Sequence, residues 1–143
     1  MNRQLLHSAL GQVIIGLNRH LNPQPKLHMH QVESKFLESL RTGTTLADGG
    51  IGSLIFQLTG RLASPDFLYE AINLRNPNLI KGIYASSLAA GATVLTTNTF
   101  SANESELTVA GAGDQVDQIN KAAITIAREA IEEHLAEYPD DSS

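Results

Sequence analysis

The sequence contains no cysteine, and its basic residues are few and scattered. The lack of cysteine excludes disulfides, together with every metal site or nucleophile that depends on a thiolate. A formal net charge of −5 without a basic cluster gives neither the footprint of a nucleic-acid-binding protein nor a polybasic membrane patch. No apolar run approaches the roughly 20 residues that span a bilayer. We therefore expect a cytoplasmic protein that has neither nucleic acid nor a membrane as a partner.

The composition that is present fits a globular protein. The 143 residues are 42% hydrophobic and 17% charged, which suits one folded domain with a single sizeable core.

The first part of the chain reads as an extension. Apolar residues recur at helical spacing from Gln4 to Leu21 and predict an amphipathic helix. Polar residues interrupt this segment and no convincing cleavage site follows, which argues against a secretory signal. Pro23 and Pro25 end the helix. We interpret residues 1–31 as a helical extension and linker that packs on the rest of the chain or on a partner, and residues 32–143 as the domain that follows.

Helical and strand-like patterns alternate in that domain. Asn76 is a favourable N-cap before Pro77, and Gly91 stands where a C′ glycine ends a helix. In chain order the expected elements are a helix over Val32–Leu40 with Phe36, Leu37 and Leu40 buried, a buried strand over Thr44–Ala47, helical turns over Gly52–Leu58, a helix over Pro77–Ala90, a strand over Thr93–Thr97 and a helix over Gln115–Glu137.

The order strand, helix, strand, helix predicts parallel strands with right-handed crossovers, as in α/β sheets and barrels. Ligands bind at the carboxyl ends of the strands in both architectures. Asp48-Gly49-Gly50 follows the first predicted strand, and Asn98-Thr99 follows the second. We therefore expect both polar clusters on one face of the domain.

Four segments in this order resemble the homocysteine S-methyltransferase family. They are Leu46–Ser53, which is similar to the family's Asp-Gly-(Gly or Ala)-x-Gly-Thr strand motif, Ile72–Pro77, which resembles Asn-Leu-x-x-Pro, Ala90–Asn103, which resembles Ala-Gly-Ala-Asp-x-x-x-Thr-Asn-Thr-Phe and its continuation, and Ile119–Ala130, which fits the helix that comes next. Ser53 and Thr93 replace the usual Thr and Asp. The resemblance covers about residues 36–135.

The resemblance implies a (β/α)₈ TIM barrel that transfers a methyl group to the sulfur of homocysteine in methionine biosynthesis. That sulfur is bound as a thiolate to zinc, which is held by cysteines of later strands. Asp48 matches the position whose carboxylate accepts from the substrate ammonium. Backbone N–H groups at Gly49 and Gly50 would meet the substrate carboxylate, and Asn98 would line the pocket or brace its loops.

A complete barrel has eight βα units and about 250 residues, whereas this sequence matches about the first two. We expect a partial α/β barrel whose zinc ligands lie beyond Ser143. On this reading the chain holds no catalytic residue, metal ligand or cofactor of its own and binds homocysteine weakly or not at all. It would be inactive alone, and it would self-associate or require a companion polypeptide.

Simpler interpretations stand beside these. Asp48 would cap the turn that follows it, Gly49 and Gly50 would be turn glycines, and Asn98 would satisfy backbone groups in its loop. His28 and His30 lack a third metal ligand nearby. In function, the alternatives are a non-catalytic interaction or regulatory module and a remnant reading frame derived from the family.

Overall fold

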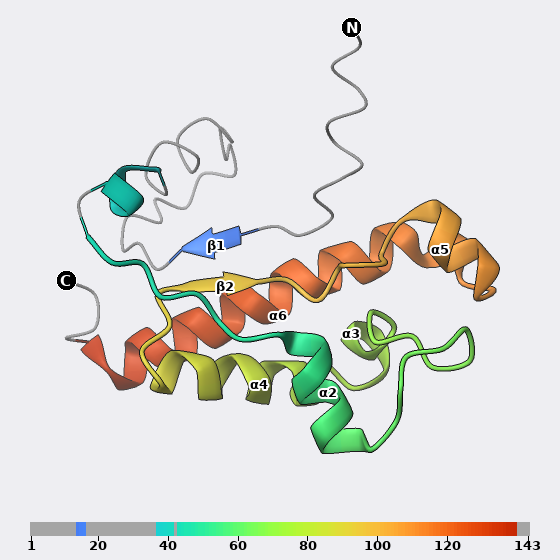
Figure 1. Ribbon diagram of the computed structural model, residues 1–143, viewed down its shortest axis with the longest axis horizontal. Coiled ribbons are helices and arrows are strands. Elements are labelled where there is room, and N and C mark those ends of the chain that lie inside the picture. Colours follow the sequence, from blue (N-terminus) through green and yellow to red (C-terminus); the bar gives the residue numbers. More distant parts are fainter. Residues whose placement is uncertain (1–13, 17–36, 42, 140–143) are drawn as a thin grey trace, which may run out of the picture.

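The computed structural model describes residues 14–16, 37–41 and 43–139 (Figure 1). Residues 37–41 are helical. The other elements, in chain order, are β1 (Ile14–Gly16), α2 (Ile51–Thr59), α3 (Ile72–Arg75), α4 (Pro77–Ala89), β2 (Val94–Thr96), α5 (Glu104–Val109), η2 (Gly113–Gln115) and α6 (Val116–Glu137).

β2 is paired on both edges, with β1 in a two-stranded sheet and with an isolated bridge on the other side. On one edge it forms a parallel bridge with Ala47, in which Val94 N–H donates to the Leu46 carbonyl at 3.2 Å and Asp48 N–H donates to the Val94 carbonyl at 3.0 Å. The parallel pairing predicted for these two segments is therefore confirmed, although the first segment, residues 46–48 (the bridged segment), contributes only an isolated bridge. Its predicted burial is wrong, because the Leu46 side chain is 50% exposed.

β1 lies antiparallel to β2, with Ile15 opposite Leu95. The continuous helix predicted over residues 4–21 is therefore wrong at Ile14–Gly16, where pairing with β2 replaces helical hydrogen bonds. The other residues of that segment lie outside the described part of the chain, as does the proposed domain boundary after residue 31. Of the helix predicted at 32–40, residues 32–36, including Phe36, lie outside the described part of the chain. Residues 37–41 are helical as predicted, but Leu37 and Leu40 are about half exposed rather than buried.

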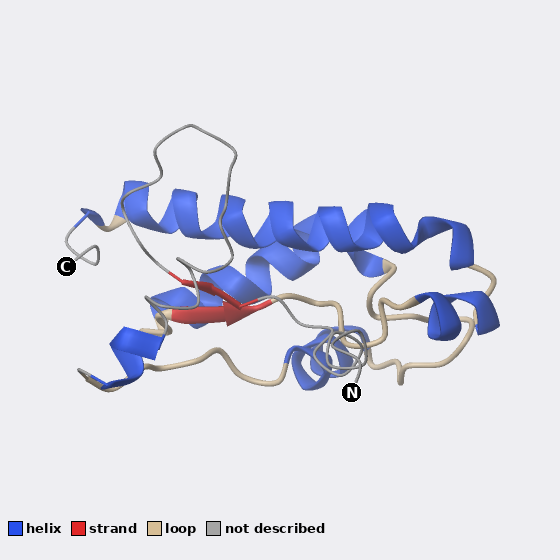
Figure 2. Cartoon of the chain, turned by 90° about the horizontal axis from the view of Figure 1, so that it is seen from above, coloured by secondary structure: helices blue, strands red, loops and turns tan. Residues whose placement is uncertain are grey.

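Helices α4 and α6 pack against each other and against Leu95 of β2 (Figures 1 and 2). The main core combines side chains from α2, α3, α4, β2 and α6, among them Ile55, Ile80, Tyr84, Leu95 and Ala127. The predicted inner face of α6 is confirmed at Ile119, Ala123, Ile126 and Ala130, which are all buried.

The end of α4 is set by a glycine. Gly91 has φ of +94°, its N–H donates to the Leu88 carbonyl, and the Ala92 N–H donates to the Ser87 carbonyl. These bonds form a Schellman motif, and they confirm Gly91 as the C′ glycine that the sequence predicted. The chain thereby turns from α4 directly into β2.

Helix α5 was not predicted. Its N-cap Asn103 accepts a hydrogen bond from the Glu106 N–H at 3.1 Å. The Asn-x-x-Glu spacing was a readable signal for a helix start. Leu107 of α5 joins Ala102, Ala112 and Ile119 in a second, smaller core.

Candidate functional site

Asp48 lies at the carboxyl end of the bridged segment, and its half-buried carboxylate binds Thr96 of β2. The Thr96 N–H donates to Oδ1 at 3.1 Å and to Oδ2 at 3.0 Å. The Thr96 hydroxyl donates to Oδ1 at 2.9 Å. The side chain of one strand end is therefore fixed to the backbone of the other.

The local geometry explains this contact. Successive residues of a strand direct their N–H and C=O groups to opposite edges. Val94 faces the bridged segment, so Thr96, two residues on, faces the same edge. Asp48 is the last residue of that segment whose backbone bonds β2. At the next position along β2, the Thr96 N–H donates to the Asp48 carboxylate instead of to a backbone carbonyl. The Asp48 carboxylate, which the simpler interpretation expected to cap its own turn, therefore bonds Thr96 across the sheet.

Gly49 and Gly50 are exposed beside this carboxylate. A Cβ built at Gly49 would meet no atom within 4 Å, and one at Gly50 would meet only the Ser53 Oγ at 3.6 Å. Gly50 is the N-cap of α2, and its carbonyl accepts from Ser53 and Leu54. The pair therefore joins the bridged segment to α2 without packing that demands glycine.

Asn98 is 2% exposed, and its amide faces the protein. Its Nδ2 donates to the Tyr69 carbonyl at 2.7 Å and to Asn73 Oδ1 at 3.0 Å. Asn73 returns a hydrogen bond from its own Nδ2 to the Asn98 carbonyl at 2.8 Å. The two asparagines thus bind each other reciprocally and hold the loop after β2 against α3.

Tyr84 of α4 lies under the same loop and is fully buried. Its hydroxyl oxygen accepts from the Asn98 N–H at 3.0 Å. Burial raises the pKa of the Tyr84 phenol well above its usual value, the Asn98 N–H opposes that shift, and the negative charge of Asp48 adds to it. The Tyr84 phenol therefore stays neutral at physiological pH and holds the loop as a hydrogen-bond acceptor.

Sequence reasoning brought Asp48 and Asn98 to one end of the sheet but missed the residues that hold them. Thr96, Asn73 and Tyr84 are these residues. Asn73 belongs to the Ile72–Pro77 segment that resembles a family motif, so the sequence pointed to its position. The sequence did not show that Asn98 is its hydrogen-bond partner. Glu70 was also missed; it is buried, and its carboxylate accepts from the Ser101 N–H at 2.9 Å.

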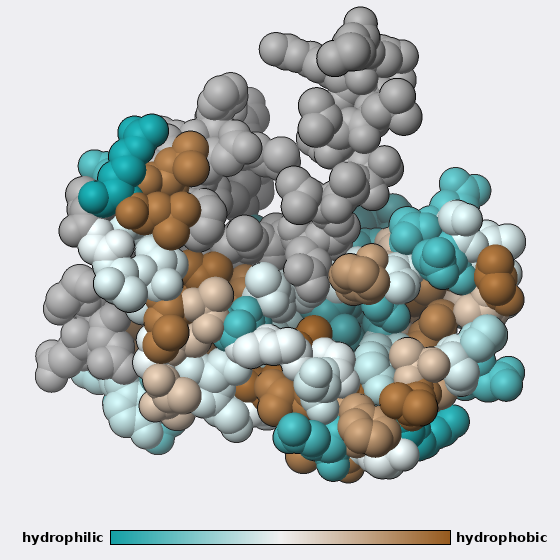
Figure 3. Space-filling model, viewed as in Figure 1, coloured by the Kyte–Doolittle hydropathy of each residue, from teal (hydrophilic) through white to brown (hydrophobic). Residues whose placement is uncertain are grey.

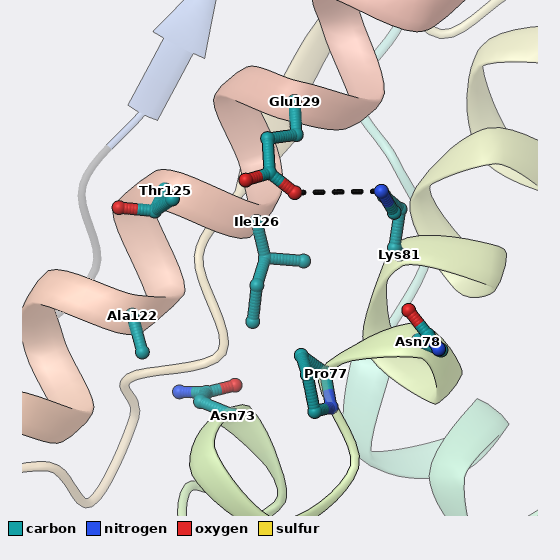
Figure 4. A pocket seen from close by; sticks show the side chains of 8 residues that line it. All are labelled: Asn73, Pro77, Asn78, Lys81, Ala122, Thr125, Ile126 and Glu129. Carbon is teal, nitrogen blue, oxygen red and sulfur yellow. Dashed lines mark hydrogen bonds and ion pairs between the residues drawn. The ribbon is translucent and has the colours of Figure 1, made fainter.

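A shallow hollow of about 310 Å³ lies elsewhere, between α4 and α6 (Figure 4). Lys81 and Glu129 form a 3.4 Å ion pair at one side of it, and Lys81 also binds Glu133 at 2.8 Å. Neither Asp48 nor Asn98 lines this hollow. The charged side chains that line this hollow, Lys81 and Glu129, are already paired with each other. We therefore place the candidate site at the strand ends.

Parallel strand ends that carry a carboxylate and adjacent glycines are typical of ligand sites in α/β proteins. The protein-family model described as homocysteine S-methyltransferase matches residues 45–139. The match spans most of the chain, from the bridged segment through α6, and the chain belongs to this family. The resemblance seen in the sequence motifs is thus confirmed. No solved structure matches the chain.

The residues present do not fit the zinc centre that this family implies. The sequence has no cysteine, and within residues 37–41 and 43–139 no three His, Asp or Glu side chains gather to hold a metal ion. Thiolate ligands for zinc would have to come from polypeptide outside these 143 residues. Among the helices of the described part, none has the length and apolar character to cross a membrane.

Proposed function

We propose that residues 45–139 form the first two βα units of a homocysteine-binding barrel and supply the half of its pocket that holds the amino acid head of the substrate. In the assembled site, methyl transfer to the homocysteine sulfur takes place. The single observation that carries the proposal, within a chain of this family, is the Asp48 carboxylate fixed at a parallel strand end beside two exposed glycines.

The Asp48 carboxylate has capacity for a substrate ammonium. A carboxylate offers about four lone-pair positions, and Thr96 makes two contacts with Oδ1 and one with Oδ2. The remaining position on Oδ2 is available to a cationic donor. Because Thr96 already fixes the carboxylate, little orientational freedom is lost when the ammonium binds.

The glycines support the same assignment. Since nothing in the chain fills the space beside Gly49, packing does not explain the absence of a side chain there. A close approach of ligand to backbone N–H groups does. The N-terminus of α2 follows at Ile51, and a substrate carboxylate at this point would gain from the positive end of that helix.

Asn98 takes the bracing role rather than the lining role in this proposal. Its amide nitrogen is already bound to Tyr69 and Asn73. It acts by holding the loop after β2 in place, so its effect on substrate is indirect.

The isolated chain binds homocysteine weakly. Hydrogen bonds to charged groups contribute about 1.5–3 kcal/mol each, and association costs at least about 4 kcal/mol. Two such contacts without the sulfur–zinc bond leave an affinity weaker than about 1 mM. The chain alone therefore has no measurable methyltransferase activity, and one zinc ion bound per chain in equilibrium dialysis would contradict this division of the site.

Amide chemical shifts test the proposal directly. Titration with tens of millimolar L-homocysteine should move the amides of residues 48–50. L-homoserine should move them equally, because the sulfur-binding half is missing, whereas 4-mercaptobutyrate, which lacks the ammonium, should not. Equal shifts with 4-mercaptobutyrate, or none with homocysteine, would overturn the assignment.

A non-catalytic interaction module is the second candidate. It is favoured by exposed apolar side chains at Phe100 and Val109, which are 80% and 74% exposed, and by apolar patches among polar ones on the face in Figure 3. A specific partner in a pull-down, unaffected by Asp48→Asn, would favour this module. A remnant reading frame predicts neither the partner nor the shifts.

A further inference from the structure

The two edges of β2 have different partners. Val94 bonds the bridged segment through its N–H and carbonyl, and Thr96 bonds Asp48 on that same edge. Because backbone groups alternate between edges, Leu95 presents its N–H and carbonyl to the other edge. The register places Ile15 of β1 opposite Leu95 there.

In a closed barrel every strand is paired on both edges by parallel neighbours. The bridged segment takes one edge of β2, so the next barrel strand belongs on the edge that carries Leu95. β1 occupies that edge but runs antiparallel, so it is not a barrel strand. No strand follows β2 among residues 97–139.

We propose that β1 is an edge strap: it covers the β2 edge that recruits the next parallel strand, and it must leave before that strand can add. The inference rests on the proposed barrel function. An uncovered strand edge is a template for pairing with another chain. The strap therefore opposes both assembly with a strand-bearing partner and association between copies.

Two proline variants test the strap through the backbone. Ile15→Pro removes the N–H that faces β2, whereas Ile14→Pro, opposite Thr96, removes one that faces away. We expect Leu95 amide exchange to accelerate at least about tenfold in Ile15→Pro and to stay nearly unchanged in Ile14→Pro. The Val94 amide, bound to Leu46 on the other edge, should keep its protection and shows that the variant is folded.

Release should also cause association between copies. In sedimentation velocity at matched concentrations, Ile15→Pro should form more oligomers than the wild type or Ile14→Pro. Unchanged Leu95 amide exchange in Ile15→Pro would refute the claim that β1 covers this edge. Faster Leu95 exchange without more oligomers would refute the claim that the uncovered edge recruits another strand. Neither readout involves homocysteine, so failure here is separable from failure of the substrate assignment.

If Ile15→Pro does not fold, a disulfide that fixes β1 to β2 tests the strap instead. Gly16 and Val94 are opposed at a position without mutual hydrogen bonds, where Cα atoms lie about 4.5 Å apart, within disulfide range. Gly16→Cys with Val94→Cys adds the only thiols of the chain. We expect the oxidised protein to associate less than its reduced form. Failure to form the disulfide, or association that oxidation does not reduce, would refute the strap.

Discussion

Asn98→Ala should destabilise the domain by about 2–4 kcal/mol. The substitution removes two hydrogen bonds from a side chain that is 2% exposed. It leaves Asn73 Oδ1 without its donor, and a buried unsatisfied group costs about 1–3 kcal/mol. The Tyr69 carbonyl keeps the Ile72 N–H as a donor, so the second lost hydrogen bond costs only about 1 kcal/mol. In a domain of this size, that loss lowers Tm by several degrees per kcal/mol.

Urea unfolding followed by far-UV circular dichroism measures this loss, with Asn78→Ala as the control. Asn78 is exposed on the first turn of α4, and its replacement should change stability by less than about 0.5 kcal/mol. Asn73→Ala combined with Asn98→Ala should cost about 1 kcal/mol less than the sum of the single changes, because the amides share a bond. An Asn98→Ala loss no larger than that of Asn78→Ala would refute the bracing role.

Two further predictions concern backbone conformation and pH. Gly91→Ala should cost about 1–2 kcal/mol because φ is +94° there, whereas Gly82→Ala, in α4 with open space around it, should stabilise by about 0.5–1 kcal/mol; equal effects by urea unfolding would contradict this reading. Burial raises the Tyr84 pKa above its ordinary value of 10.0, so the folded chain keeps a proton that the unfolded chain releases. The contribution of Tyr84 protonation to the free energy of unfolding is fully present below pH 10. Above pH 10 it is lost by up to about 1.4 kcal/mol per pH unit. Tyr84→Phe should be less stable at pH 8 but have a shallower alkaline slope, and parallel curves above pH 10 would exclude the shift.

The helices were the most predictable part of the fold because their signals are local. Pro77 and Gly91 mark the two ends of α4, and the period of Ile119, Ala123 and Ile126 gives the buried face of α6. The same periodicity failed at Ile14–Gly16. There, hydrogen bonds to a strand about 80 residues away outweigh a weak helical preference that Gly16 lowers further.

The candidate site could be located from the sequence but not built from it. Asp48 and Asn98 are at the strand ends where the motif placed them. What each side chain contacts depends on residues 48 and 25 positions away, Thr96 and Asn73. A local pattern cannot show that Asp48 bonds across the sheet or that the Asn98 amide points inward.

The central claim is that Asp48 holds the ammonium of a homocysteine head group. Comparing amide shifts of the wild type and Asp48→Asn during a homocysteine titration tests this claim most directly. We predict that the variant, which retains an oxygen for Thr96 but carries no charge, stays folded and loses the shifts at residues 49 and 50. A folded Asp48→Asn chain with undiminished shifts would contradict the account.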